Sequence, residues 1–352
     1  MRRPGGVYDL SYSQDMAILR TRFRWTMALF GGVLLMCTPF LAGPVVTNLL
    51  NVVAITSISV AGLNLLMGFA GQISIGHAAF MAVGAYTGGI LATHFGVTFW
   101  LGLPSAGICA ALAGILVALP SLRVKGFYLA MATLAVQFII PWIVINVRPD
   151  ITGGINALTL PRPKIGSFVL DSQEKWLYVI MPLTFLMLFF AKNLARTRLG
   201  RAWVAIRDND LAAEALGVNL FHYKALAFAA SSFYAGVAGC LWAFWAGAAS
   251  TEPFGLHYSV WLLGMAIIGG LGTTLGSILG AAAIVVLDRI VLISGPIIEP
   301  LLPTVTKGTV GASMAPITFG LVLTLFLIFE PRGLAHRWEV IRSWWDHYPF
   351  RY

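Results

Sequence analysis

The strongest constraint on this chain is a stretch of 98 consecutive residues, between Arg24 and Arg123, that contains no Asp, Glu, Lys or Arg. About 20 apolar residues suffice for a helix to cross a bilayer once. Soluble domains carry roughly 25% charged residues, whereas this chain of 352 residues carries 11%. The stretch must therefore cross a membrane several times, and lipid replaces water around most of the protein.

Gly and Pro punctuation divides the chain into successive apolar runs. It predicts ten spans, near residues 25–42, 45–67, 75–93, 98–120, 127–147, 176–191, 225–247, 258–271, 275–294 and 315–329. The expected fold is an all-α, polytopic transmembrane bundle of about ten spans, with both termini on one side. Its expected parts are an N-terminal arm (1–24), a permease domain (25–330) with a charged loop at 192–222, and a tail (331–352).

Basic residues are distributed unequally between the two predicted faces. The N-terminal arm, the 121–125 turn, the 192–224 loop and the tail carry 17 of them, against five on the opposite face. This bias predicts that both termini and residues 192–222 are cytoplasmic, while loops 148–175 and 295–314 face the periplasm. The net charge of +9 then comes mostly from basic residues in the predicted cytoplasmic loops, and it gives no support to a nucleic-acid partner.

Motifs for chemistry are missing from the sequence. None of the six lysines follows a Gly, so there is no phosphate-binding Gly-Lys-Ser/Thr loop, and no His-x-x-x-His, Cys-x-x-Cys or Gly-x-Ser-x-Gly is present. The sequence therefore predicts no enzyme, no cofactor and no metal. Ion-coupled transport is also disfavoured, because no acidic residue sits clearly at a span centre and Asp288 is followed directly by Arg289.

A glycine-rich polar segment, residues 68–80, follows the second predicted span. Irregular backbone at membrane depth is tolerated where it is buried in protein or lines a watery cavity, so Gln72, Ser74 and His77 are predicted to line or gate a translocation pathway. The alternative is a short turn in which Ser74 caps the third span and His77 is hydrogen-bonded in packing. Residues 268–276 repeat the glycine-rich character.

The 192–222 loop carries the most specific pattern. Asp208 to Asp210 supply N-cap candidates, Leu211 to Leu216 read as a short helix, and Gly217 is placed to end it in a left-handed conformation. Such a helix is what a membrane domain needs to dock a motor subunit. The alternative is a solvated loop with an incidental helix.

These segments together resemble permease subunits of ATP-binding-cassette importers for branched-chain amino acids, of the LivM type. The resemblance is carried by residues 71–80, 126–135, Thr152-Gly-Gly, Arg207-Asp, Ala-Ala-Glu-Ala-Leu-Gly (212–217), 269–272 and Pro331-Arg-Gly-Leu, and it runs from about residue 45 to 335. Glu330 departs from the pattern, because a basic residue is expected before Pro-Arg-Gly-Leu.

The resemblance implies an importer made of several subunits in a bacterial-type inner membrane. The expected partners are a homologous second permease, two ATP-binding subunits that hydrolyse ATP, a periplasmic substrate-binding protein and the lipid bilayer. The expected coupling helix comprises Asp210, Leu211, Ala212, Ala213, Glu214, Ala215, Leu216 and Gly217. Branched-chain or related small amino acids are the expected substrates. Urea, amides or other small solutes carried by related permeases, and a stand-alone secondary transporter or channel, are the alternatives.

Overall fold

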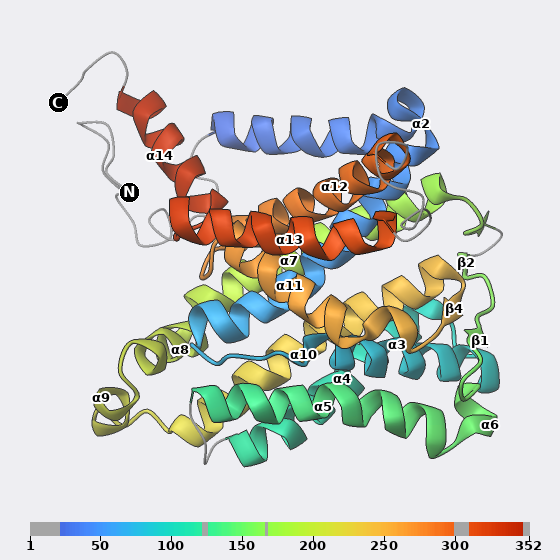
Figure 1. Ribbon diagram of the computed structural model, residues 1–352. Helices are drawn as coiled ribbons and strands as arrows, with labels where there is room; N and C mark the ends of the chain where they lie inside the picture. The colour runs from blue at the N-terminus through green and yellow to red at the C-terminus, as the bar shows by residue number, and fades with distance from the viewer. Residues whose placement is uncertain (1–21, 122–125, 166–167, 299–309, 348–352) are drawn as a thin grey trace.

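The computed structural model describes residues 22–121, 126–165, 168–298 and 310–347, and it is a bundle of long helices (Figure 1). The predicted N-terminal arm, the 121–125 turn and the 295–314 loop lie largely outside the described residues. The main helices are α2 (Arg22–Asn64), α3 (His77–His94), α4 (Phe99–Ser121), α5 (Phe127–Asn146), α7 (Gln173–Arg196), α10 (Leu220–Ala246), α11 (Leu256–Gly269), α12 (Thr274–Ile298) and α13 (Val310–Phe329).

Each of the ten predicted ranges lies largely within helix. The first two share α2, which breaks at Gly43, where φ is 71° and ψ is 174°. Six helices are long and apolar enough to cross a membrane, or seven if the bent pair α13–α14 is one span, within the described residues. A polytopic all-α fold is therefore confirmed, while the number ten and the orientation of the termini stay predictions.

Short elements complete the chain. A π-helical turn, η1 (Leu65–Phe69), extends α2, and α8 (Arg198–Asp208) and α9 (Asp210–Ala215) occupy the predicted cytoplasmic loop. The end of the bundle opposite α8 and α9 carries the helical turn α6 (Pro149–Thr152), the 3-10 turn η2 (Glu252–Phe254) and four two-residue strands. Strand β1 (Leu158–Thr159) pairs with β4 (Ala248–Ala249), and β2 (Lys164–Ile165) pairs with β3 (Phe168–Val169). The chain ends in α14 (Leu334–His347).

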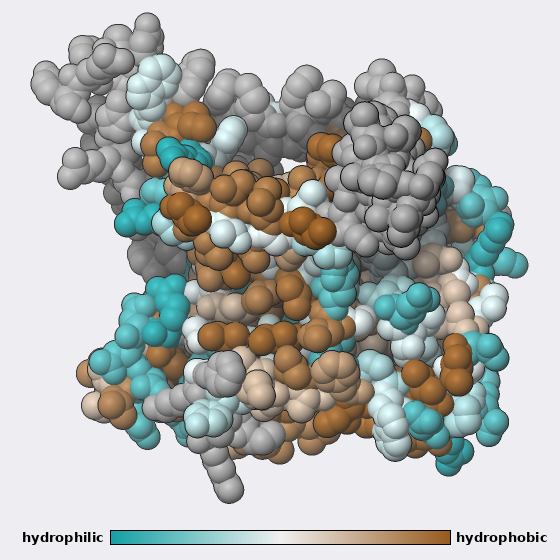
Figure 2. Space-filling view, viewed as in Figure 1, coloured by the Kyte–Doolittle hydropathy of each residue, from teal (hydrophilic) through white to brown (hydrophobic). Residues whose placement is uncertain are grey.

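Polar segments gather at the two ends of the bundle. Figure 1 shows α8, α9 and the start of α14 at the left, and α6 with the strands at the right. In Figure 2 hydrophobic residues cover much of the face between these ends, whose left and right edges are more hydrophilic. This is the arrangement that the loop charges predict, since residues 192–222 and 331–347 share one end.

Small residues let the helices of the core approach closely. A Cβ on Gly239 of α10 would lie 1.9 Å from the Met81 carbonyl oxygen of α3, and one on Gly84 would lie 2.1 Å from the Gly236 carbonyl oxygen. Helices in lipid associate through such close packing rather than through exclusion of water. Helix α10 is accordingly enclosed by α2, α3 and α4, and the sites described below are built on this rigid centre.

Candidate functional site

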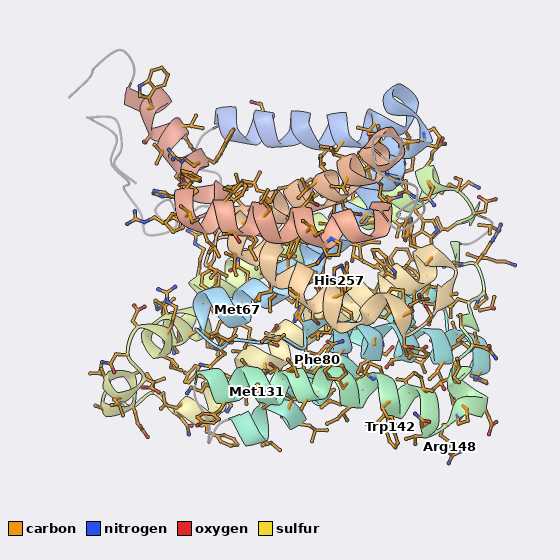
Figure 3. All side chains as sticks on the ribbon, viewed as in Figure 1. Met67, Phe80, Met131, Trp142, Arg148 and His257 are labelled. Atoms are coloured by element: carbon orange, nitrogen blue, oxygen red, sulfur yellow. The ribbon has the colours of Figure 1, made fainter. Side chains whose placement is uncertain are left out.

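The glycine-rich segment after α2 interrupts the helical bundle. The chain leaves α2 at Asn64, makes the turn η1, and then runs without helix from Gly71 to Gly76 before α3 begins at His77. Figure 1 shows this stretch returning from the left end of the molecule into the bundle, and Figure 3 places Met67 toward that end and Phe80 further inside. Helix α3 therefore starts within the protein.

Side chains from other helices satisfy the free backbone N–H groups at the start of α3. The Ile75 N–H donates to Thr133 Oγ1 of α5 at 3.0 Å, and the Ala79 N–H donates to Gln137 Oε1 at 3.0 Å. Ser259 Oγ of α11 accepts from the Ala78 N–H at 2.9 Å and donates to Gln137 Oε1 at 2.7 Å. A helix N-terminus buried without such partners would be costly, so this polar cluster explains why α3 can begin here.

The three predicted pathway residues occupy different environments. Gln72 is half-buried and borders a cavity, whereas Ser74 and His77 are each 1% exposed. His77 Nε2 lies 3.0 Å from the Ser59 carbonyl oxygen, and the other ring nitrogen has no partner among the described residues. Ser74 does not cap α3, because the N-cap position is Gly76 and no side chain caps there.

Asn64 joins the two glycine-rich segments, which are about 200 residues apart in the chain. Its Nδ2 donates to the Thr273 carbonyl oxygen at 2.7 Å, and its Oδ1 accepts from the Gly272 N–H at 2.7 Å. The contact is tight, since a Cβ on Gly68 would lie 2.1 Å from Asn64 Oδ1 and 2.3 Å from the Gly272 nitrogen. We call the contact of Asn64 and Gly68 with Gly272 and Thr273 the glycine junction.

Arg207, the penultimate residue of α8, connects the polar loop to this junction. Its Nη1 donates to the Gly68 carbonyl oxygen at 2.8 Å, and its stem packs against Gly71, where an added Cβ would lie 2.8 Å from Arg207 Cγ. Trp203 anchors the same helix to α10, since its Nε1 donates to the Tyr223 carbonyl oxygen at 2.9 Å. Helix α8 is therefore in direct contact with η1, the turn that extends α2.

A polar cavity of about 370 Å³ lies between the glycine-rich segment and the loop. It is lined by Ala70, Gly71, Gln72, Ile73, Gly126, Leu129, Ile206, Arg207, Asp208, Asn209, Asp210 and Lys224. Lys224 is 6% exposed, and its Nζ lies 3.9 Å from Asp210 Oδ2. The cavity thus separates the predicted gate from the predicted coupling helix.

Helix α9 (Asp210–Ala215) lies within the segment 210–217 that was expected to be the coupling helix. Asn209 is its N-cap and accepts a hydrogen bond from the Ala212 N–H at 3.1 Å, and Gly217 follows it with φ of +86°. Ala213 is 2% exposed, whereas Leu211 and Leu216 are 69% and 85% exposed. The helix therefore buries the small side chain of Ala213 and presents two large apolar side chains outward.

Sequence reasoning missed the residues that join these parts. Asn64, Gln137 and Ser259 are polar residues inside apolar runs, and a buried polar residue is retained where it has a partner. A polar residue inside an apolar run therefore indicates a buried hydrogen bond, but the sequence does not identify the distant group that forms this bond.

Known proteins resemble this chain over most of its length. A family model described as branched-chain amino acid transport system / permease component matches residues 45–329. The LivM protein of the high-affinity branched-chain amino acid transport system of Escherichia coli K12 is 33% identical over 278 residues, which are 72% of this chain and 65% of that protein. This chain thus spans somewhat less than two thirds of that relative.

Two further relatives are more distant. A probable branched-chain amino acid transport permease protein LivM of Methanocaldococcus jannaschii is 23% identical over 244 residues, covering 67% of this chain and 68% of that protein. An autoinducer 2 import system permease protein, LsrC, of Enterobacter sp. strain 638 is 33% identical over 118 residues, 32% of this chain and 34% of that protein. No solved structure matches the chain.

Proposed function

The chain belongs to the permease component family of branched-chain amino acid transport systems, and on this premise we propose that it is a membrane-spanning subunit of an ATP-binding-cassette importer. It would translocate branched-chain or related small amino acids across the inner membrane. Its partners would be a homologous second permease, two ATP-binding subunits and a periplasmic substrate-binding protein. It is a transport subunit in this proposal, and hydrolysis of ATP takes place on the partners.

The observation that carries this proposal is the form of α9. A short capped helix that offers Leu211 and Leu216 to the outside has the stiffness and the apolar contacts that docking to another protein requires. The link from α8 through Arg207 to the glycine junction supplies a route by which a partner's motion reaches the bundle. We propose that residues 210–217 are the coupling helix.

We further propose that the segment containing Gln72, Ser74 and His77 gates the pathway. Gln72 borders the cavity beside the coupling loop, while Ser74 and His77 are buried where the irregular segment enters α3. Groups without a fixed charge suit a passage that must release a small zwitterion as readily as it admits one. Movement of this segment would open or close the way past α3.

Autoinducer 2 is the second candidate substrate, because an autoinducer 2 import permease is similar to 32% of this chain. The discriminating experiment is uptake of radiolabelled leucine by cells that lack branched-chain amino acid import and express this chain with its partner subunits. Excess isoleucine and valine should abolish the uptake, whereas urea, acetamide and autoinducer 2 should leave it unchanged. Competition by autoinducer 2 alone would reassign the substrate.

A stand-alone secondary transporter remains the alternative mechanism. Asp288 of α12 is half-buried and is the acidic residue that such a mechanism would need. In the same cells, Asp288→Asn should retain uptake, because coupling to ATP does not require a carboxylate there. Uptake that persists without the ATP-binding subunits and is lost in Asp288→Asn would establish the alternative.

A further inference from the structure

The polar cavity beside the coupling loop has the size of a binding site for a small molecule. Its volume of about 370 Å³ lies at the lower end of the range for ligand pockets in proteins. Its wall is formed by the segment after η1, the start of α5, the end of α8 with the start of α9, and the first turns of α10. Figure 1 shows α8, α9 and the stretch before α3 at the same end of the bundle. A ligand here would therefore contact both the proposed gate and the proposed coupling helix.

Charges of both signs line the cavity. Lys224 Nζ lies 3.9 Å from Asp210 Oδ2, and Arg207 pairs with Asp208 at 3.0 Å. Lys224 is the only buried one among the charged side chains that the structure describes. The formal charges of these four side chains cancel, so a simple anion or cation would meet as many like charges as opposite ones. The lining therefore favours a ligand that carries one charge of each sign.

The pair of Lys224 and Asp210 leaves both groups able to bond to such a ligand. Their separation of 3.9 Å exceeds the length of a hydrogen bond, so the ammonium of Lys224 does not donate directly to the carboxylate of Asp210. A ligand carboxylate can accept from Lys224 while a ligand ammonium donates to Asp210. Hydrogen bonds between charged groups of this kind are stronger than those between neutral groups.

Aliphatic side chains form another part of the same wall. Ala70, Leu129 and Ile206 are buried there, and Ile73 is 40% exposed. Covering apolar surface with another apolar group is favourable, because that surface is removed from water. The cavity thus combines charges of both signs with an aliphatic surface, as the binding of an amino acid with an apolar side chain requires.

We propose that this cavity binds a small aliphatic amino acid from the cytoplasm, with Lys224 holding its carboxylate and Asp210 its ammonium, and that the bound molecule inhibits import. The inference rests on the proposed function for the identity of the transported amino acid and for the cytoplasmic location of the loop. A ligand between Ile73 and Asp210 would join the gate segment to the coupling helix and oppose their relative movement. An amino acid that accumulates in the cytoplasm would then slow its own import.

The first test is binding of radiolabelled leucine to the full chain in neutral detergent, measured by equilibrium dialysis without the binding protein. The wild-type chain should bind leucine saturably. The Lys224→Gln, Asp210→Asn double variant removes both charges and should raise the Kd about tenfold or more. The matched control, Lys175→Gln, Asp171→Asn, removes a Lys–Asp ion pair at the other end of the bundle and should change the Kd less than twofold. Equal Kd values in the two variants would overturn the site.

Leucine analogues test the need for both charges in the wild-type chain, whether or not the double variant folds. Isopentylamine lacks the carboxylate and 4-methylpentanoate lacks the ammonium, so each should displace labelled leucine at least about tenfold less well than unlabelled leucine does. Displacement by 4-methylpentanoate at the level of leucine would show an anion site and contradict the proposal. Ile73→Trp enlarges a side chain on the cavity wall and should weaken leucine binding, whereas Ile73→Val should retain it. Undiminished binding in Ile73→Trp would place leucine elsewhere.

The second test measures inhibition in the complete complex in nanodiscs without the binding protein. Leucine should lower the rate of ATP hydrolysis at least about twofold, and the ratio of rates with and without leucine should return to near one in Lys224→Gln, Asp210→Asn. An unchanged wild-type rate, or loss of leucine binding when the ATP-binding subunits assemble, would overturn the inference. Leucine uptake without leucine binding to the chain would remove this inference alone. Leucine binding without leucine uptake would remove the proposed function and leave the binding site.

Discussion

Arg207 Nη1 donates a 2.8 Å hydrogen bond to the carbonyl oxygen of Gly68, a residue 139 positions earlier in the chain. This bond is the direct connection between the polar loop that carries α9 and the end of α2. Arg207 also pairs with Asp208 at 3.0 Å, but that ion pair is exposed and joins neighbours in sequence. The two interactions can therefore be removed separately.

Arg207→Gln should uncouple ATP hydrolysis from uptake in the reconstituted importer. A hydrogen bond from a charged group contributes about 1.5–3 kcal/mol, so we expect leucine transported per ATP hydrolysed to fall about tenfold or more. Asp208→Asn removes the exposed ion pair and keeps the bond to Gly68, and it should change the ratio less than twofold. Equal ratios in the two variants would remove Arg207 from the coupling route.

Gly68→Ala should destabilise the glycine junction. The added methyl group would meet Asn64 Oδ1 and the Gly272 nitrogen, and overpacking of this kind costs about 1–3 kcal/mol. The Tm of the detergent-solubilised chain should fall. Gly320→Ala on α13 is the control, because nothing lies within 4 Å of a Cβ there, so its Tm should hold or rise with helix propensity. A fall in Tm for Gly320→Ala alone would show that the junction is not the tight contact.

His77→Ala should cut uptake while leaving assembly of the complex and basal ATP hydrolysis nearly intact. The substitution removes the ring that bonds the Ser59 carbonyl oxygen at the start of α3, where we place the gate. His94→Ala is matched to it, since His94 ends the same helix and its Nε2 lies 3.0 Å from the Ile151 carbonyl oxygen. Failure of assembly in His77→Ala, with assembly retained in His94→Ala, would establish packing as the role of His77.

Impermeant thiol labelling of intact cells tests the orientation. Ile155 and Leu216 are 90% and 85% exposed at opposite ends of the bundle, so single cysteines there should react readily in a background without Cys37, Cys109 and Cys240. Ile155→Cys should label from the periplasm and Leu216→Cys only after the membrane is permeabilised. Labelling of Leu216→Cys from outside would invert the topology drawn from the basic residues.

The parts of this structure that could be predicted are those set by near neighbours in sequence. Local backbone chemistry accounts for the cap at Asn209, the helix after it and the left-handed conformation of Gly217. It also accounts for the break in α2 at Gly43-Pro44. The glycine junction could not be predicted, because Asn64 and Gly272 meet across 208 positions and one polar residue has many possible partners. Residues 331–347 were expected only as part of a tail, and the close approach of Gly333 to Gly270 joins segments that are far apart in the chain.

Our central claim is that ATP-driven motion of a partner enters this chain through α9, and the most direct measurement is ATP hydrolysis stimulated by the binding protein together with leucine uptake in proteoliposomes of the complete complex. The Glu214→Lys, Gly217→Val double variant reverses an exposed charge and places a branched side chain at φ of +86°, which costs about 1 kcal/mol or more. Glu214→Gln, Gly217→Asn is the control, because Asn tolerates that conformation. We predict that the first variant loses both stimulation and uptake, with the chain still inserted, and that the control keeps most of both. Stimulation at the wild-type level in the Glu214→Lys, Gly217→Val variant would contradict the account.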